Sequence, residues 1–336
     1  MSLRSTTEPM QGVAPANAPA AVAASSAKVW SELFKARLTA LVLLTTTLGF
    51  YFGARDGLGG MLFWETMAAT ALLASGAAAL NQYLERDADA LMERTRKRPL
   101  PSGRVTPALA LQVGVAMSVA GMLWLTFRVN PLTGLLGTLT LASYLFVYTP
   151  LKRVTTWNTM VGAVPGALPP LMGWTAATGE LGAGGWALFT ILFFWQLPHF
   201  MAIAWMYRDD YARGGFRMLP VVDPEGRRTG MTAVRHTVAL MAFSLAPVAL
   251  GLAGRWYAGV AMAMGIAFLA CAVVFAARLT RESARRLFLA SILYLPVLLS
   301  VLVADRTHPN AAQRVLALQG GVMAPAFEKA FATAPH

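Results

Sequence analysis

Long apolar stretches dominate the chain and alternate with short polar segments. Nine of these stretches span about 18 to 25 residues, which is enough to cross a hydrocarbon core of roughly 30 Å as a helix. A backbone in lipid must satisfy its own hydrogen bonds, so helices are the expected form. The pattern therefore predicts an all-α, polytopic membrane protein with nine transmembrane helices. They lie near residues 38–54, 61–84, 107–127, 131–149, 157–177, 184–206, 232–253, 256–277 and 286–304.

The composition excludes an ordinary soluble fold. Hydrophobic residues make up 56% of the 336 residues and charged residues only 13%, whereas soluble domains carry about a quarter charged residues. A net charge of +12 would suggest nucleic-acid binding in a soluble protein. In a membrane protein it reflects basic cytoplasmic loops, so we expect no nucleic-acid partner. The single cysteine, Cys271, excludes an intrachain disulfide and a cysteine-rich metal site.

The distribution of Lys and Arg predicts the orientation. With the N-terminus inside, 22 of the 28 basic residues fall on the inner side of the membrane. Because basic residues favour cytoplasmic loops, we expect a bacterial cytoplasmic (inner) membrane protein with its N-terminus inside and its C-terminus outside. Residues 1–27, rich in Ala, Pro, Ser and Thr, are expected to form a disordered cytoplasmic tail. Residues 28–305 would form the nine-helix domain, and residues 306–336 an outer C-terminal tail.

Acidic side chains gather at two predicted inner helix ends, and the spans themselves hold almost none. Asn81, Glu85 and Asp89 are spaced i, i+4 and i+8, so on a helix they form one polar stripe. Carboxylate and carboxamide oxygens are hard ligands of the kind that Mg²⁺ prefers, often beside a substrate phosphate. The spacing therefore indicates a magnesium site. A charged helix end with local ion pairs is the alternative that spacing alone leaves open.

Basic side chains follow this stripe at once, between residues 86 and 98. Guanidinium groups beside a metal suit a diphosphate. Lys152 and Arg153, on a short inner loop, are further phosphate candidates, although topology alone also favours basic inner loops. The second acidic cluster, Asp209 and Asp210, follows the sixth predicted helix as the first cluster follows the second. The two helix ends would face each other and share metal ions, or Asp209 and Asp210 would simply be solvated beside arginines.

His199 stands inside the sixth predicted span, directly after Pro198. An ionisable side chain at that depth is expected to face the bundle interior. It would contact a polar part of a large substrate or ligate a porphyrin iron. A hydrogen bond to a backbone carbonyl freed by Pro198 is the alternative.

Three segments, in order, resemble the UbiA superfamily of intramembrane prenyltransferases, over about residues 30 to 305. The superfamily's first motif, Asn and two Asp at intervals of four and then Arg-Thr-x-x-Arg-Pro-Leu, is matched by Asn81, Glu85, Asp89 and residues 94–100. Glu85 departs from the common Asp and reaches one methylene further. Residues 148–173 resemble the superfamily's Tyr-Thr-Pro-x-Lys-Arg and Gly-Ala-x-Pro-Gly-Ala-x-Pro-Pro tracts. Residues 195–215, with Trp-Gln-Leu-Pro-His and a later Asp-Tyr, are similar to the members that farnesylate heme.

The resemblance implies a Mg²⁺-dependent enzyme whose helices surround an intramembrane cavity. The implied reaction transfers farnesyl from farnesyl diphosphate to a vinyl group of heme B, with addition of water, to give heme O and diphosphate. The implied partners are these two substrates and the lipid bilayer, with heme A synthase and oxidase assembly proteins as further candidates. The implied metal ligands are Asn81, Glu85, Asp89, Asp209 and Asp210, and the implied diphosphate ligands are Arg86, Arg94, Arg98, Lys152 and Arg153. Asn81, Glu85, Asp89 and Lys152 are the expected catalytic residues, and His199 is the expected heme contact.

Three other functions compete with this interpretation. Another prenyltransferase of the superfamily would act on a quinone precursor or a chlorophyllide, but residues 195–199 argue against it. A secondary transporter is disfavoured by the lack of acidic residues in mid-membrane. A non-catalytic heme-binding or oxidase-assembly protein would need no acidic and basic motif of the kind at residues 81–98.

Overall fold

The computed structural model describes residues 26–54 and 58–307, and within them the regular structure is helical, with no named strand. The all-α prediction is confirmed. Of the tail predicted at residues 1–27, only Ser26 and Ala27 belong to the described part, where they open a helix. Of the tail predicted at residues 306–336, only Arg306 and Thr307 are described. The rest of both tails lies outside the described residues.

A helix stands at each of the nine predicted apolar stretches. In chain order these helices are α2 (Ala36–Gly53), α3 (Met61–Leu91), α4 (Pro107–Trp124) with η1 (Leu125–Val129), α5 (Pro131–Ala142) with η2 (Ser143–Tyr148) and α6 (Thr149–Val154), α7 (Asn158–Thr178), α8 (Ala183–Met206), α11 (Arg227–Phe243) with α12 (Ala246–Ala249), α13 (Arg255–Arg278) and α14 (Arg281–Ala304). The remaining short helices are α1 (Ser26–Leu33), α9 (Arg208–Arg213) and α10 (Leu219–Val222).

Eight of these described segments are long and apolar enough to cross a membrane. The exception is α7, where Pro165, Pro169 and Pro170 stand inside the helix and most side chains are buried. Its neighbours shield it from lipid, so α7 needs less hydrophobicity than a lipid-facing span. A helix therefore stands at each of the nine predicted spans, but only eight of these described helices are long and apolar enough by themselves to cross a membrane.

Local sequence signals explain where several helices begin. Thr106 accepts a hydrogen bond from the backbone N–H of Leu109, and Pro107 occupies the first turn of α4. Asn130 caps α5 in the same way by accepting from Thr133, again with a proline next in sequence. A polar cap followed by proline satisfies orphan N–H groups and presets the backbone. These signals fix helix starts without reference to the rest of the fold.

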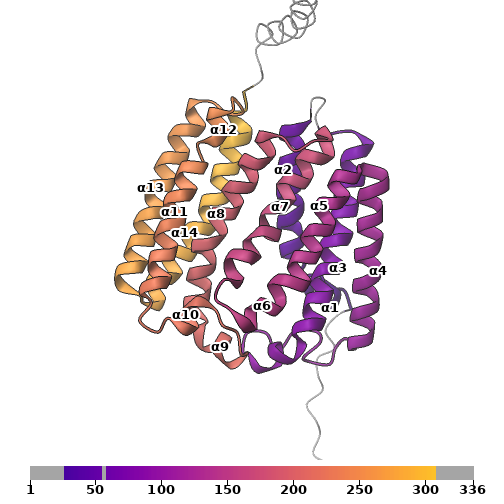
Figure 1. Ribbon diagram of the computed structural model, residues 1–336, viewed down its shortest axis with the longest axis vertical. Helices are drawn as coiled ribbons and strands as arrows, with labels where there is room; N and C mark the ends of the chain where they lie inside the picture. Colours follow the sequence, from indigo (N-terminus) through magenta and orange to yellow (C-terminus); the bar gives the residue numbers. More distant parts are fainter. Residues whose placement is uncertain (1–25, 55–57, 308–336) are drawn as a thin grey trace, which may run out of the picture.

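The long helices stand side by side in two groups joined by α7 and α8 (Figure 1). One group holds α2, α3, α4 and α5, and the other α11, α13 and α14. The backbone of α7 lies directly against that of α2 in the first group. Gly49 and Gly173 permit this approach, because a Cβ on either residue would collide with a carbonyl of the partner helix. Such close approach is the usual role of small residues between membrane helices.

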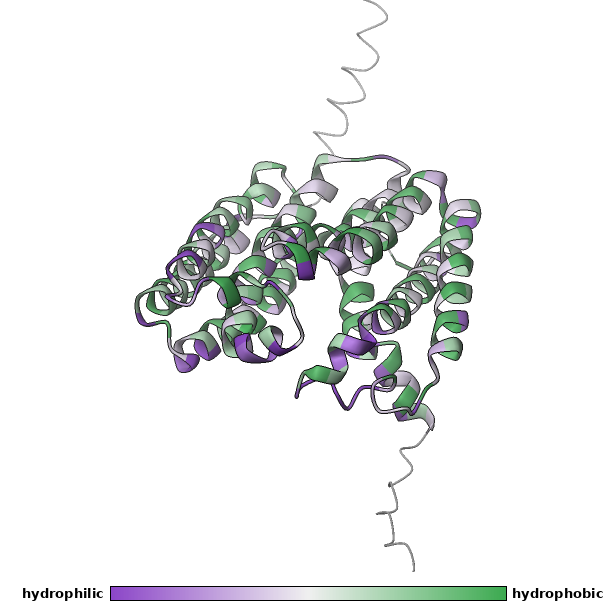
Figure 2. Ribbon diagram, turned by 60° about the horizontal axis from the view of Figure 1, so that its bottom comes forward, coloured by the Kyte–Doolittle hydropathy of each residue, from purple (hydrophilic) through white to green (hydrophobic). Residues whose placement is uncertain are grey.

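Short helices and polar loops gather at one end of the bundle. The elements α1, α6, α9 and α10 all lie at the lower end in Figure 1, whereas α14 ends at the opposite end. Figure 2 shows that hydrophilic residues concentrate at helix ends and in connecting segments and that the long helices are mainly hydrophobic. The described chain thus begins at the polar end and finishes at the opposite end, as expected for a chain that crosses the membrane an odd number of times.

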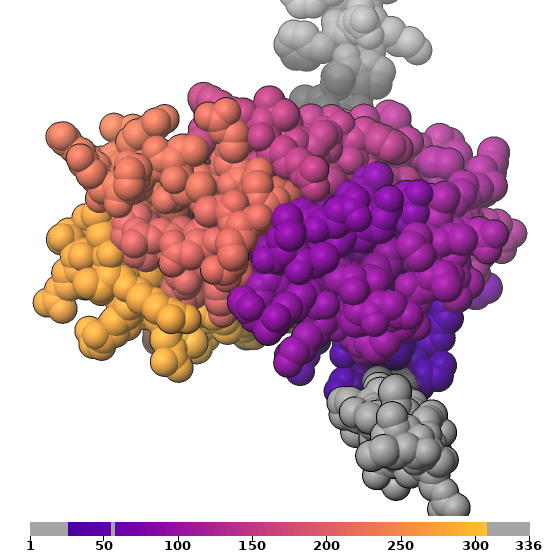
Figure 3. Space-filling view, turned by 90° about the horizontal axis from the view of Figure 1, so that it is seen from below, coloured from indigo at the N-terminus to yellow at the C-terminus, as the bar shows by residue number. Residues whose placement is uncertain are grey.

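The loop after α3 packs against the segment after α8 at this polar end. Ala88 and Met92 on one side contact Ala204, Phe216 and Met218 on the other. The view from below shows the two segments in direct contact across the face of the molecule (Figure 3). The two acidic clusters predicted from the sequence are therefore brought to the same end of the bundle.

Candidate functional site

The acidic stripe of α3 forms one wall of a cavity. Asn81, Glu85 and Asp89 are only 1%, 5% and 1% exposed, and all three line a cavity of about 340 Å³. The i, i+4, i+8 spacing explains their common direction, because successive members lie one above the other on a helix. Asp87, off the stripe, is exposed. The structure therefore places the predicted stripe on a single cavity wall.

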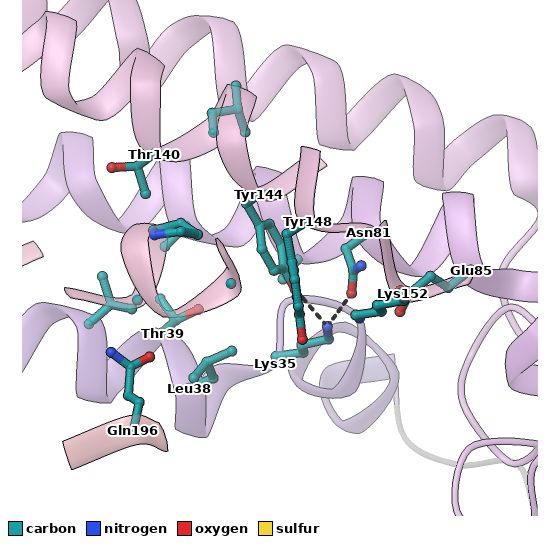
Figure 4. Close-up of a pocket in the computed structure, with 18 of the residues that line it drawn as sticks. Lys35, Leu38, Thr39, Asn81, Glu85, Thr140, Tyr144, Tyr148, Lys152 and Gln196 are labelled. Carbon is teal, nitrogen blue, oxygen red and sulfur yellow. Dashed lines mark hydrogen bonds and ion pairs between the residues drawn. The ribbon is translucent and has the colours of Figure 1, made fainter. Parts of the chain in front are cut away.

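Three cations from other segments reach this stripe, one to each side chain. Lys152 Nζ lies 2.6 Å from Glu85 Oε1, and Arg98 Nη1 lies 2.7 Å from Asp89 Oδ2. Lys35 Nζ donates to Asn81 Oδ1 at 2.6 Å. The close-up in Figure 4 shows Lys35 and Lys152 pointing toward Asn81 and Glu85. The site is thus a buried cluster of alternating oxygens and cations.

Two tyrosines lie against these lysines. The rings of Tyr144 and Tyr148 are stacked with centroids 5.8 Å apart, and Lys152 Nζ lies 4.4 Å from the centre of the Tyr148 ring. Lys35 also contacts the Tyr144 hydroxyl at 3.4 Å. Gly162 of α7 makes room, because a Cβ there would overlap the Tyr148 ring. An aromatic face stabilises a desolvated cation, so the rings support the lysines.

Asp210 organises the loop that follows α3. Its two carboxylate oxygens accept the backbone N–H groups of Glu93 at 2.9 Å and Arg94 at 3.1 Å, and it also pairs with Arg213. Desolvation opposes ionisation of Asp210, but these donors outweigh it and hold its pKa below the ordinary value. Asp210 therefore acts here as an anchor for the loop that carries Arg94 and Arg98.

Arg94 belongs to the same wall. Its guanidinium donates to the Tyr211 hydroxyl at 2.9 Å and lies over the rings of Tyr207 and Tyr211. Burial works against its charge, yet contact with Tyr211 leaves its pKa above the ordinary value. Burial, reinforced by the nearby charge of Arg98, instead lowers the pKa of Lys35 to about 7. Arg94 therefore stays a permanent cation at the cavity, whereas the charge of Lys35 depends on the groups around it.

Four other predicted residues lie off the cavity lining. Arg86 lies over the ring of Tyr83 at the outside of α3, and Arg153 is exposed at the end of α6. Asp209 is exposed beside Arg208 at 3.8 Å. Asp210 lies behind the loop that it anchors and also does not line the cavity. The structure therefore brings together Asn81, Glu85, Asp89, Arg94, Arg98 and Lys152 from the predicted set.

His199 is placed on a different face of α8. Its Nδ1 lies 2.7 Å from the Ser291 hydroxyl, and its ring packs against Trp195 and Phe288 at 5.0 Å between centres. The neighbouring residue Phe200 lines the cavity, but His199 does not. The bond goes to a side chain of α14 rather than to a carbonyl freed by Pro198. This placement gives the predicted heme contact no geometric support and favours a packing role.

The rest of the cavity is mainly apolar. Its wall includes Leu38, Val42, Leu73, Pro169 and Met172, and Gln196 lies across the cavity from the charged cluster (Figure 4). An apolar chamber with ionic groups at one end suits a ligand with a charged head and a hydrocarbon chain. Pro165 and Pro169, inside α7, thus contribute directly to the chamber.

The donor set fits a divalent metal. No group of three or more His, Cys, Asp or Glu side chains capable of holding a metal is found among residues 26–54 and 58–307. The stripe instead offers two carboxylates and one carboxamide oxygen, and Asp89 Oδ1 is buried without a hydrogen-bond partner. Mg²⁺ is held by one or two carboxylates together with water and substrate phosphate. Asn81, Glu85 and Asp89 are therefore sufficient for such a site.

Several residues of this site could not be singled out from the sequence. Lys35 was visible only as one of many basic residues of the inner side, and Tyr144 only as part of an apolar span. Tyr148 stands four residues before Lys152, so their contact on a helix was a readable signal. Lys35 approaches Asn81 across 46 positions of sequence, which no local pattern reports.

The arrangement defines a membrane-embedded transferase of prenyl groups. The model of the UbiA prenyltransferase family matches residues 42–295, and the chain belongs to this family. Among its relatives is the protoheme IX farnesyltransferase of Solibacter usitatus, 47% identical over 82% of this chain and 97% of the relative. The protoheme IX farnesyltransferase of Salinibacter ruber is 49% identical over 82% of this chain and 99% of its own. The chain is an integral membrane prenyltransferase.

Solved structures share the fold at low sequence identity. A digeranylgeranylglyceryl phosphate synthase superposes with a TM-score of 0.71 and 14% identity, covering 83% of this chain and 98% of that one. A UbiA homolog from Archaeoglobus fulgidus bound to GPP and Mg²⁺ gives a TM-score of 0.60 at 15% identity, covering 82% and 99%. The helical membrane architecture predicted from the sequence is the architecture of these proteins.

Proposed function

We propose that this enzyme transfers a farnesyl group from farnesyl diphosphate to a vinyl group of heme B, with addition of water, and releases heme O and diphosphate. Relatives named protoheme IX farnesyltransferase, 42–49% identical over 82–84% of the chain, support this choice. The observation that carries it is the cavity itself, where a cationic end and an apolar chamber fit a prenyl diphosphate.

In this proposal the charged cluster binds the diphosphate head. Arg94, Arg98 and Lys152 would hold its oxygens, because guanidinium and ammonium groups donate charge-assisted hydrogen bonds to phosphate. Arg86 and Arg153, which lie off the lining, would add longer-range attraction at the entrance. These donors favour departure of the diphosphate because they stabilise the negative charge that develops on it.

Asn81, Glu85 and Asp89 would hold Mg²⁺ in this site. The ion would supply further neutralisation of the leaving diphosphate. Asp210 would support the site by fixing the loop that carries Arg94 and Arg98, and Asp209 would lie at its outer edge. Tyr144 and Tyr148 would shield the reacting end of the prenyl chain from water and keep the lysines in position.

The cellular setting is part of the proposal. The charge distribution supports a bacterial cytoplasmic membrane, with the N-terminus and the diphosphate site inside and the C-terminus outside. Heme O would pass to terminal oxidases directly or as a precursor of heme A, so heme A synthase and oxidase assembly proteins are the proposed protein partners.

Pigment analysis tests the reaction. Membranes from cells that lack the activity, expressing this chain and supplied with heme B, farnesyl diphosphate and Mg²⁺, should yield a more hydrophobic heme with the mass of heme O. The Asp89→Asn chain, matched in amount, serves as the inactive control. Recovery of heme B alone from the wild-type membranes contradicts the proposal. Prenylation of an aromatic acid, supplied in place of heme B in a parallel assay, would favour a quinone-pathway enzyme instead.

A further inference from the structure

Every oxygen-bearing side chain of the stripe already holds a cation of the protein. Lys35 faces Asn81, Lys152 faces Glu85 and Arg98 faces Asp89, each at 2.6 or 2.7 Å. The three cations come from the junction before α2, from α6 and from the loop after α3. All three line the cavity, as the stripe residues do, so a ligand inside it would meet both the cations and the stripe oxygens.

Lys35 is held in this position by the backbone around it. It stands at the break between α1 and α2 in the left-handed conformation, with φ of 48°, which a non-glycine residue adopts only when its surroundings impose it. Gln82, next to Asn81, donates to the carbonyls of Glu32 and Leu33 and so ties the end of α1 to α3. The same tie places the Lys35 ammonium at Asn81.

The charge balance disfavours a metal ion alone. The stripe carries two carboxylates, against which stand Arg98, Lys152 and the nearby Arg94, so the wall already has more cations than anions before Lys35 is counted. A divalent ion that took the stripe oxygens would add charge and leave buried cations without partners. Unpaired charge in a poorly solvated site is strongly unfavourable. A diphosphate removes this penalty because its oxygens accept the displaced cations.

We propose that Lys35, Arg98 and Lys152 occupy the stripe in place of the metal until a diphosphate arrives, so that metal and diphosphate bind cooperatively. Lys35 then moves from Asn81 to the diphosphate and becomes a binding residue of the site. The inference rests on the proposed function only in taking a diphosphate as ligand. It concerns binding, so it holds whichever acceptor receives the prenyl group.

Metal binding measured with and without inorganic pyrophosphate tests this coupling. The full chain in lipid nanodiscs is titrated with Mn²⁺, bound Mn²⁺ is followed by electron paramagnetic resonance, and free Mn²⁺ is matched between the two series. Pyrophosphate should tighten Mn²⁺ binding at least about tenfold, within the usual range of coupling between two ligands. Binding of labelled pyrophosphate, measured with and without Mn²⁺, should change by the same factor, because coupling is reciprocal.

Variants assign the effect to Lys35. Lys35→Met, which keeps the length and removes the ammonium, should bind Mn²⁺ alone severalfold more tightly and show a smaller enhancement by pyrophosphate. Lys35→Arg should retain the coupling. Arg37→Met removes an exposed cation two residues away, outside the cavity lining, and should match the wild type. If Lys35→Met does not fold, Lys152→Met tests the same displacement from Glu85.

The outcomes separate this inference from the function itself. Equal Mn²⁺ affinity with and without pyrophosphate overturns the coupling, while the farnesyl transfer stands. If pyrophosphate enhances Mn²⁺ binding as strongly in Lys35→Met as in the wild type, the role proposed for Lys35 is wrong. Failure of pyrophosphate to bind under any condition counts against the diphosphate site, and therefore against the proposed function.

Discussion

At the scale of single residues, neighbours in sequence have opposite surroundings. Asp89 is buried on the stripe and paired with Arg98, whereas Asp87, two positions earlier on the same helix, is exposed. His199 packs against α14, whereas Phe200 lines the cavity. A rotation of about 100° per residue on a helix separates the two members of each pair. Such pairs provide matched variants for testing roles.

Asp89→Ala should lower the rate of prenyl transfer at least about a hundredfold, because it removes a buried carboxylate that holds Arg98 and the proposed metal. Asp87→Ala should cost much less. Single-turnover rates measured on membranes with equal amounts of each chain check both. Equal losses from the two substitutions would contradict the assignment of the stripe as the active face.

His199→Ala should lower the free energy of unfolding by about 1–3 kcal/mol, since the Ser291 hydroxyl loses one of its two partners, keeping only the Phe288 carbonyl, and a cavity opens between α8 and α14. Its affinities for heme B and for farnesyl diphosphate should stay at the wild-type values. Separate titrations of each substrate, with thermal unfolding on the same samples, distinguish a packing role of His199 from a heme contact. Weakened heme binding with intact farnesyl diphosphate binding would restore His199 as a heme contact.

At the scale of elements, the site depends on how the loop after α3 is held against the segment after α8. Of the three cations that contact the stripe, Arg98 and Lys152 belong to motifs visible in the sequence, and Lys35 does not. The loop is fixed by Asp210 through backbone N–H groups, which any loop sequence would supply. Thr95 also bonds to the Asp89 carbonyl and closes the turn. The geometry of the cationic end is thus a property of the contact between the two segments.

Asp210→Ala should release this loop. Loss of the charge-assisted bonds to Glu93, Arg94 and Arg213 should raise KM for farnesyl diphosphate about tenfold or more, at roughly 1.5–3 kcal/mol per bond to a charged group. Limited proteolysis should cut the loop between residues 93 and 98 faster than in the wild type. Asp209→Ala, exposed and off the cavity, is the control. Normal proteolysis with weakened Mg²⁺ binding would instead support Asp210 as a metal ligand.

At the scale of the whole molecule, the polar end of the bundle carries the site and the opposite end does not. The charged cluster, the loop after α3 and the helices α9 and α10 lie together at that end (Figure 1). In the proposed function, the charged head of the substrate would enter from water, and its hydrocarbon chain would occupy the apolar chamber within the bundle. The orientation in the membrane therefore determines which compartment supplies the diphosphate.

A topology measurement tests that orientation. A reporter fused after His336 should be active only when it needs the outer compartment, and one fused near Asp223 only when it needs the inner one, because 22 of 28 basic residues lie on the proposed inner side. Alkaline phosphatase and green fluorescent protein fusions report the two compartments. The reverse pattern would place the diphosphate site on the outer face.

The sequence determined the local features of this protein. Helix positions followed from apolar stretches longer than the bilayer core is thick, and helix starts from caps such as Thr106 and Asn130. The common face of Asn81, Glu85 and Asp89 followed from helical spacing alone. These features depend on residues within a few turns of one another, so no knowledge of the partners is needed.

The tertiary structure decided everything that depends on helix rotation and on distant segments. Lys35 reaches Asn81 only because α1 is tied to α3, and Asp210 anchors a loop more than 100 positions earlier in the chain. The depth of His199 was readable from the sequence, but the direction of its side chain, toward Ser291 of α14, was not. The free energy of packing sets these rotations through contacts between helices, and a single apolar stretch carries no record of which face its neighbours cover.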